Sequence, residues 1–212
     1  MKCDRRFMRL YAVTDRSWTE KKSLAEQVRE AISGGVTCVQ LREKELDYEA
    51  FFAEALAIRD LCRGQGVPFI INDNVELALN CSADGVHVGQ SDMNASDVRS
   101  LIGSDKILGV SVQTVEQAKT AEQNGADYLG VGSIFPTSTK PDAADVSLDT
   151  LRSICGSVSI PVCAIGGINA ENILQLKGTG LDGVALVSAI FASSDITKTC
   201  RHLLKLSEEA VC

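Results

Sequence analysis

Short runs of apolar residues alternate with amphipathic stretches along the whole chain. Eight of the runs are almost entirely apolar, which is typical of parallel strands that are buried on both faces. The predicted strands are residues 8–14, 38–42, 69–72, 85–88, 107–112, 128–132, 161–165 and 183–187. The stretches between them place apolar residues at helical spacing. The predicted helices are residues 23–33, 48–63, 74–80, 95–102, 114–124, 147–154, 169–177 and 188–208.

Eight strand–helix units predict a closed (β/α)8 TIM barrel with a parallel sheet, formed as a single domain by residues 1–212. The alternative is an open doubly wound sheet, which usually carries a glycine-rich dinucleotide turn after its first strand. Here that position reads Thr14-Asp-Arg-Ser17, which weakens the alternative. A barrel also predicts where function lies, because active sites of this fold form at the carboxyl ends of the strands.

Composition and charge exclude several classes of protein. Hydrophobic residues make up 45% of the chain and charged residues 23%, as in ordinary soluble proteins. The net charge of −7 argues against a nucleic-acid partner or an anionic membrane surface. The eight cysteines include no CxxC pair, so a zinc site or redox pair has no support. The chain lacks an apolar run of signal-peptide or transmembrane length, and we expect a cytoplasmic protein with reduced thiols.

Cations and an amide follow the second predicted strand. Side chains in a strand repeat every two residues, which places Gln40, Arg42 and Lys44 on one side and Glu43 on the other. Two cations and an amide without a carboxylate would bind a polyanion. A solvated surface cluster is the alternative, but Gln40 lies within an apolar run and argues against it.

Two carboxylates stand at the ends of neighbouring predicted strands. Asp73 follows the third strand and Asp92 follows the fourth. Carboxylates beside a cationic pocket suit Mg²⁺, which proteins usually hold with one or two carboxylates and the phosphates of a substrate. Each aspartate alone could instead cap a helix, above all Asp73. His87 lies inside the fourth strand, and the sequence leaves open whether it faces the barrel centre or the helices.

Further polar groups suited to anions follow the later strands. Ser111 ends the fifth strand and can donate to an anion. Gly166 and Gly167 permit close approach of a ligand to the backbone after the seventh strand, and Ser188 opens a helix after the eighth. Loops at these two positions often form a phosphate site in barrel enzymes. Simple turns are the alternative.

The loop after the sixth strand has an unusual composition. Pro136 and Pro141 bracket three hydroxyl residues and one lysine, namely Thr137, Ser138, Thr139 and Lys140. Such a loop suits a ligand with several negative oxygens, although a solvated turn has a similar composition. No nucleophilic triad or well-placed general base accompanies these groups. The residues therefore indicate group transfer with a diphosphate leaving group, stabilised by cations and metal.

Several of these segments match a known family in order. The chain resembles thiamine-phosphate synthases over nearly its whole length, through Leu10-Tyr-Ala-Val-Thr-Asp15, Gln40-Leu-Arg-Glu-Lys44, Ile71-Asn-Asp73, Gly85-Val-His-Val-Gly-Gln90, Phe135-Pro-Thr-Ser-Thr-Lys140, Ala164-Ile-Gly-Gly167 and Val187-Ser188. The resemblance implies a TIM-barrel transferase of thiamine biosynthesis. It would join 4-amino-5-hydroxymethyl-2-methylpyrimidine diphosphate to 4-methyl-5-(2-phosphoethyl)thiazole, giving thiamine phosphate and pyrophosphate by a dissociative, carbocation-like route.

The resemblance also implies roles for individual residues. The diphosphate would be held by Arg42, Lys44, Asn72, Ser111 and Lys140, with Gln40 lining the same substrate's site. Arg42, Lys44 and Lys140 would act in catalysis. Mg²⁺ would bind Asp73 and Asp92, and the thiazole phosphate would meet Thr137, Thr139, Gly167, Val187 and Ser188.

One position departs from the family's pattern, and two other functions stay open. Ser91 stands where the family often has an acid before the metal-binding aspartate, so the charge around Asp92 is in doubt more than the metal itself. A thiazole tautomerase-like isomerase would not need a diphosphate clamp, and a non-catalytic phosphate-binding barrel would not need Mg²⁺. Small-molecule substrates are the expected partners, and the sequence neither requires nor excludes a homo-oligomer.

Overall fold

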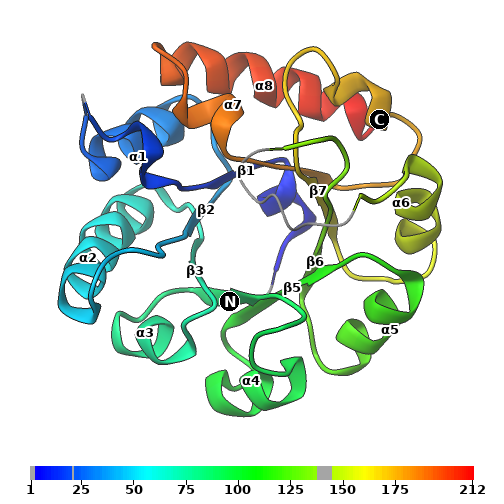
Figure 1. The fold of residues 1–212 in the computed structure, drawn as a ribbon, viewed down its shortest axis with the longest axis horizontal. Coiled ribbons are helices and arrows are strands. Elements are labelled where there is room, and N and C mark those ends of the chain that lie inside the picture. The colour runs from blue at the N-terminus through cyan, green and yellow to red at the C-terminus, as the bar shows by residue number, and fades with distance from the viewer. Residues whose placement is uncertain (1–2, 21, 138–144) are drawn as a thin grey trace.

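Eight parallel strands close into a barrel in the order of the sequence (Figure 1). The computed structural model describes residues 3–20, 22–137 and 145–212. The strands are β1 (Leu10–Val13), β2 (Cys38–Leu41), β3 (Phe69–Asn72), β4 (Gly85–Val88), β5 (Ile107–Val112), β6 (Tyr128–Val131), β7 (Val162–Ile165) and β8 (Gly183–Leu186). The last strand pairs with the first, which confirms the predicted TIM barrel.

Helices surround the barrel and cover the outer face of its sheet (Figure 1). They are α1 (Leu24–Ser33), α2 (Tyr48–Gln65), α3 (Val75–Asn80), α4 (Ala95–Ile102), α5 (Val115–Gln123), α6 (Leu148–Cys155), α7 (Ser188–Phe191) and α8 (Ile196–Ala210). Three short 3-10 segments are η1 (Arg5–Met8), η2 (Arg16–Trp18) and η3 (Ile173–Leu176). Among the described residues, no helix is long and apolar enough to span a bilayer.

Polar side chains explain where the helices begin. Ser23 accepts from the backbone N–H of Glu26, whose carboxylate accepts from Ser23 N, a complete capping box. A capping box at the start of α5 is only half formed. Thr114 accepts from Gln117 N, but the Gln117 side chain accepts from Gln113 N instead.

Two predicted helices are wrong in part. The segment predicted as a helix over residues 169–177 holds only η3, because Asn169 accepts from Glu171 N and Asn172 accepts from Asn169 N. These side-chain bonds compete with helical ones. The helix predicted over residues 188–208 divides into α7 and α8, since Asp195 caps a new helix by accepting from Lys198 N.

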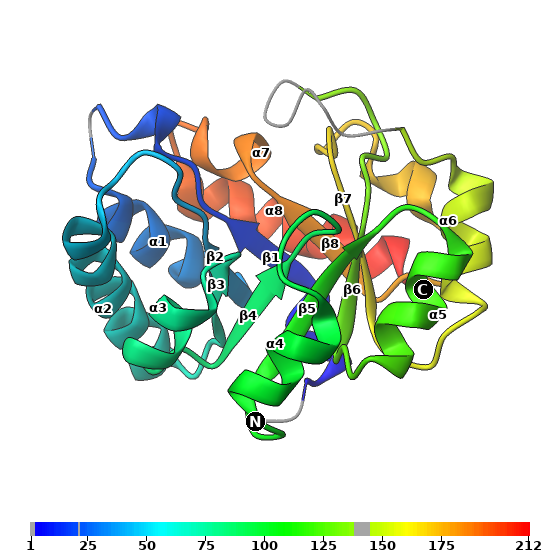
Figure 2. The same cartoon turned by 60° about the horizontal axis from the view of Figure 1, so that its bottom comes forward.

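Strand register decides which residues face the interior of the barrel. Side chains alternate along a strand, and paired residues of neighbouring strands share a face. The interior holds a small apolar cluster that includes Tyr11, Cys38, Ile70 and Tyr128, separate from the larger core between sheet and helices. Towards the carboxyl ends of the strands, Val13 of this cluster pairs with the inward residue Gln40. Helix α7 and the segment after β6 lie at that end of the barrel (Figure 2).

Candidate functional site

A cavity of about 500 Å³ opens at the carboxyl ends of the strands. Most of the residues predicted to bind ligand line it, namely Gln40, Arg42, Asn72, Asp92, Ser111, Thr137, Gly166, Gly167, Val187 and Ser188. A volume of this size suits a small-molecule substrate. Lys44 and Asp73 do not line this cavity. Thr139 and Lys140 lie outside the described residues.

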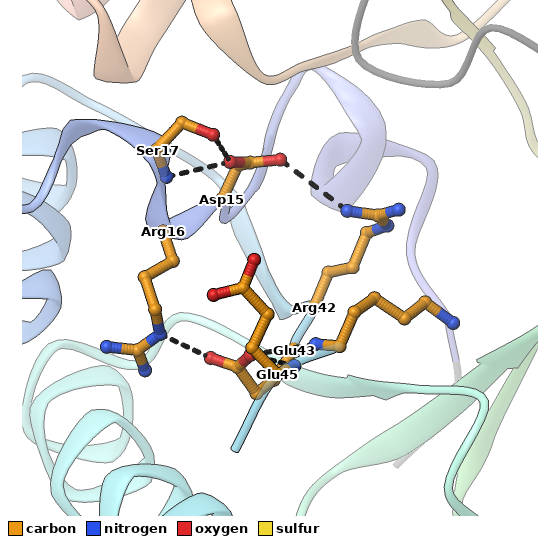
Figure 3. Close-up of a pocket in the computed structure, with 7 residues that line it drawn as sticks. Asp15, Arg16, Ser17, Arg42, Glu43 and Glu45 are labelled. Carbon is orange, nitrogen blue, oxygen red and sulfur yellow. Dashed lines mark hydrogen bonds and ion pairs between the residues drawn. The ribbon is translucent and has the colours of Figure 1, made fainter.

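A second, smaller pocket of about 140 Å³ shares Arg42 with the cavity. Figure 3 shows the residues that line this smaller pocket. Lys44 is part of its wall. The Arg42 guanidinium lies 3.5 Å from the Asp15 carboxylate, which also accepts from the backbone N–H and the hydroxyl of Ser17. The sequence prediction missed Asp15, which faces this cation.

Glu43 lies in the wall of the small pocket and pairs with Arg16 rather than with Arg42 or Lys44. Its side chain is only 3% exposed and lies 2.7 Å from the Arg16 guanidinium, which also contacts Glu54 at 2.6 Å. Burial alone would raise the pKa of Glu43. Hydrogen bonds from the Glu45 backbone N–H and the Arg16 guanidinium stabilise the charged carboxylate, and the pKa is lowered overall. Burial raises the pKa of Glu54, against the attraction of Arg16. This cluster holds the start of the β2–α2 connection, which carries both predicted cations.

Lys44 reaches across to Asp73, with 2.6 Å between Nζ and Oδ2. Asp73 has a positive φ of 61° and donates its backbone N–H to His87 O. The residue therefore lies in a sharp turn at the end of β3. The helix that follows is capped by Asn74, and the alternative role of Asp73 as a cap is therefore wrong. Asp92 accepts from Gly89 N at 2.7 Å. The described residues contain no cluster of three or more metal-binding side chains.

His87 faces the barrel centre, which settles the question that the sequence leaves open. Its Nε2 lies 2.8 Å from Ser111 Oγ and its Nδ1 lies 2.8 Å from the Tyr128 hydroxyl. The Tyr128 hydroxyl is 2.7 Å from that of Tyr11, to which Gln40 Nε2 donates at 2.7 Å. Sequence reasoning missed both tyrosines, because each lies in a run that is otherwise apolar. Their strand parity, shared with Gln40 and His87, is the signal that places them inside.

The turns after β6 and β7 pack directly on each other. Gly166 and Gly167 have φ values of 98° and 63°, which favour glycine. A Cβ atom on Gly167 would lie 2.5 Å from Pro136 O, and Phe135 N donates to Gly166 O. Glycine is therefore required here for backbone packing as well as for any approach of a ligand.

Ser188 begins α7 as predicted, but α7 contains only four residues. This helix is much shorter than the segment predicted over residues 188–208, and its dipole is correspondingly small. The first backbone N–H groups of a helical turn still lack partners within the turn. Ser188 and Val187 therefore bring a hydroxyl and backbone donors to the cavity wall.

The cysteines form no disulfide and supply no activated nucleophile. All eight are free, and Cys163 lines the cavity. Burial raises the pKa of Cys163 and of Cys38, so both thiols stay protonated.

Comparisons with known proteins give one consistent result. The family model of thiamine monophosphate synthase matches residues 10–190. The thiamine-phosphate synthase of Ruminiclostridium cellulolyticum is 52% identical over 197 residues, which cover 93% of this chain and 94% of that protein. The enzyme of the same name from Clostridium tetani is 48% identical, over 92% of this chain and 93% of the relative.

A solved structure agrees with these relatives. Thiamine phosphate pyrophosphorylase from Pyrococcus furiosus superimposes with a TM-score of 0.90 at 40% identity, over 98% of this chain and 99% of the other. The family match, the relatives and the shared barrel show that the chain is a transferase and belongs to the thiamine monophosphate synthase family.

Proposed function

We propose that the enzyme transfers the 4-amino-2-methylpyrimidin-5-ylmethyl group from its diphosphate to 4-methyl-5-(2-phosphoethyl)thiazole, with Mg²⁺ as cofactor. The observation that carries this proposal is the cavity at the strand ends. It has Gln40, Arg42 and Ser111 on one wall and Gly167 and Ser188 on another. Two groups of anion-binding residues on one cavity suit two phosphorylated substrates that react with each other.

The diphosphate would bind on the side of β2, β3 and β5. Arg42 and Lys44 supply positive charge, and Asn72 and Ser111 supply neutral polar groups. Both cations face carboxylates, and the exposed fraction of the Lys44 side chain is 54%. An ion pair this exposed contributes about 0–1 kcal/mol, so a diphosphate can replace Asp73 beside Lys44 at low cost. Lys140 is proposed for the same role on its sequence motif alone.

The carboxylates of Asp73 and Asp92 fit a role as Mg²⁺ ligands. Asp73 already accepts a cation, the Lys44 ammonium, which stands in for the charge of a metal. Two carboxylates suffice where substrate phosphates complete the coordination. When bound, Mg²⁺ would neutralise charge that develops on the leaving diphosphate. Ser91 beside Asp92 adds a hydroxyl in place of the acid common in the family.

The thiazole phosphate would bind between the turns after β7 and β8. Gly167 approaches the loop after β6 closely, and Val187 and Ser188 supply the start of a helical turn. Thr137 lines the same cavity. Thr139 is assigned to this phosphate on the resemblance of the loop.

The reaction needs charge stabilisation more than acid–base chemistry. The C–O bond to the diphosphate breaks with its electron pair leaving on oxygen, and the thiazole nitrogen then forms the new C–N bond to the methylene carbon. The cation formed between these steps must be shielded from water. Apolar side chains, including Ile165, Ala185 and Leu186, line the cavity and serve this purpose. The protonated thiols do not compete as nucleophiles.

A two-substrate assay tests the proposal. With both substrates and Mg²⁺, we expect thiamine phosphate by chromatography and an equal amount of pyrophosphate, and we expect chelation of Mg²⁺ to stop both. Conversion of a thiazole without the pyrimidine diphosphate would indicate an isomerase. Folded protein that binds phosphates but yields no product would indicate a binding protein.

A further inference from the structure

A continuous chain of hydrogen bonds crosses the interior of the barrel between two residues of the proposed site. It runs from Gln40 through Tyr11, Tyr128 and His87 to Ser111, with each link between 2.7 and 2.8 Å. The two phenol rings meet edge to face, with centroids 5.8 Å apart. The middle three residues have no assigned role in the binding of either substrate.

Counting hydrogens gives the chain a direction. Gln40 Nε2 donates to the Tyr11 hydroxyl, which holds one hydrogen and passes it on to Tyr128. Tyr128 in turn donates to His87 Nδ1, so that the His87 hydrogen resides on Nε2 and points to Ser111. This direction gives both phenol hydrogens and the ring hydrogen a partner, and it leaves only the Ser111 hydroxyl hydrogen to face the cavity. The opposite direction would make Tyr11 accept from both sides and would leave its own hydrogen without an acceptor in the chain.

The barrel interior is shaped to hold this chain. Gly109 and Gly130 occupy inward positions on β5 and β6 where other residues would project side chains. A Cβ atom on Gly109 would lie 2.2 Å from Tyr128 Cζ and 2.4 Å from His87 Nδ1. Burial raises the pKa of both tyrosines, which keeps each phenol protonated as a donor.

We propose that Tyr11, Tyr128 and His87 are positioning residues that fix how Gln40 and Ser111 face the substrate. Ser111 accepts from His87 and therefore keeps its own hydrogen to donate to a negative oxygen. Gln40 donates one amide hydrogen to Tyr11, and its carbonyl oxygen remains available as an acceptor. With the chain reversed, Ser111 would turn only lone pairs towards an anion. The proposal rests on the substrate-binding roles proposed above for Gln40 and Ser111.

Nitrogen NMR tests the direction of the chain without any turnover. The protein contains only two histidines, His87 and the exposed His202, so the imidazole region of a ¹⁵N-labelled sample holds two sets of signals. At neutral pH and without ligand, we expect His87 as a single neutral tautomer with hydrogen on Nε2. His202 serves as the internal reference. A ring that carries hydrogen on Nδ1, or on both nitrogens, overturns the proposed direction.

Breaking the chain in the middle tests its effect on function. Tyr128→Phe keeps the ring and removes the central hydroxyl. We expect the His87 signal to become a mixture of tautomers, kcat/KM to fall about tenfold, and KM to rise for the pyrimidine diphosphate only. Tyr11→Phe, which separates Gln40 from the remaining chain, should give a similar loss while His87 stays bonded to Tyr128.

Ile70→Val is the matched control. Ile70 belongs to the same interior cluster but has no polar link to the chain and does not line the cavity. This variant should retain the wild-type His87 signal and both KM values. If Tyr128→Phe behaves like Ile70→Val, or raises both KM values alike, the residues are structural and the proposal is wrong. A wild-type protein that makes no thiamine phosphate refutes the proposed function instead, and the NMR result then still reports on the chain.

Discussion

At the scale of single residues, two inward-facing glycines make room for the polar side chains in the barrel interior. The α-carbons of Gly109 and Gly130 face inward, and the volume beside them is filled by His87 and Tyr128. A methyl group on Gly130 would lie 3.2 Å from His87 Cε1, a tighter contact than usual. The polar chain therefore depends on two residues that form no hydrogen bond with it.

Gly109→Ala should damage both stability and activity. The new methyl group collides with Tyr128 and His87, and we expect a loss of about 1–3 kcal/mol of unfolding free energy, measured in urea, together with reduced kcat/KM. Gly64→Ala is the control, because Gly64 lies in helix α2 with open space around it. That change should stabilise the protein by about 0.5–1 kcal/mol. Equal urea midpoints for the two variants would contradict the steric argument.

Lys44→Ala should separate function from folding. Its ion pair with Asp73 is half exposed, so the melting temperature should hardly change. A charged contact to the diphosphate is worth about 1.5–3 kcal/mol, which predicts a loss of roughly 10- to 150-fold in kcat/KM. Lys119→Ala, an exposed lysine on α5, should leave both quantities unchanged. A large loss of stability in Lys44→Ala would indicate a structural role instead.

Strand parity explains which site residues the sequence can predict. Gln40, Asn72 and Ser111 reach the cavity because alternation along a strand fixes their side. His87 lies on the same face as its register partner Asn72, but this pairing is visible only in the folded structure. Lys44 lies beyond the end of its strand, where alternation no longer applies. Its contact with Asp73 depends on loop geometry that no periodicity encodes.

At the scale of elements, ion pairs anchor the connection between β2 and α2. Arg16, within η2, bridges Glu43 in this connection and Glu54 in α2. Glu43 also accepts from the backbone N–H groups of Lys44 and Glu45. The connection that carries the two cations proposed to bind the diphosphate is thus tied to two neighbouring elements.

Arg16→Gln should lower stability in a pH-dependent way. The folded protein holds the pKa of Glu43 below its ordinary value of 4.5, so the charged carboxylate stabilises the fold above that pH. That contribution is lost as pH falls through the lowered pKa. Removing Arg16 should therefore cost about 1–3 kcal/mol at neutral pH and less at about pH 4. Melting temperatures of both proteins at the two pH values measure this difference.

Arg152→Gln is the control for this experiment. Its ion pair with Asp149 is exposed on α6, with the Asp149 side chain 92% exposed. The difference in melting temperature between Arg152→Gln and the wild-type protein should be the same at the two pH values. If Arg16→Gln and Arg152→Gln show the same difference from wild type at each pH, Arg16 does not anchor this connection.

Helix boundaries show where sequence periodicity falls short. Apolar spacing continues through residues 188–208, yet the chain breaks between α7 and α8. Ser193 and Asp195 accept hydrogen bonds from the backbone there, and such competition is local rather than periodic. The same reason explains why the segment over residues 169–177 is mostly irregular, with two asparagines bonded to nearby backbone.

At the scale of the whole molecule, closure of the barrel brings the site together. Every carboxyl strand end faces the same rim, so residues from β2 to β8 meet at one cavity. The eight apolar runs predicted this architecture, since only parallel strands covered on both faces suit such sequences. The register and the closing pair of β1 with β8 are needed to bring particular side chains into contact.

Ligand binding should stabilise the entire barrel by mass action. With pyrophosphate and Mg²⁺ at about 100 times the dissociation constant, the gain is about 2.7 kcal/mol. For a chain of 212 residues this corresponds to a rise of roughly 5–10 °C in melting temperature. Mg²⁺ alone should have little effect. Asp73→Asn should lose the part of the shift that requires Mg²⁺, and an unaltered shift would exclude Asp73 as a ligand.

Thiol accessibility should follow the burial of the cysteines. Cys212 is exposed, while burial raises the pKa of Cys3 and Cys155 to about 12. We expect one thiol to react rapidly with a disulfide reagent in the native protein and all eight to react in guanidinium. Several fast thiols in the native state would contradict the described packing. Fewer than eight in denaturant would indicate a disulfide.

The pairing of Arg42 with Asp15 and of Lys44 with Asp73 has a consequence for how anionic substrates arrive. These neutralised cations project little attractive field, and the protein as a whole carries a charge of −7. Long-range steering therefore does not draw the diphosphate in, and attraction begins only once it competes with the carboxylates at contact distance. Added salt screens the repulsion at a distance, so moderate ionic strength favours encounter even as it weakens the final contacts.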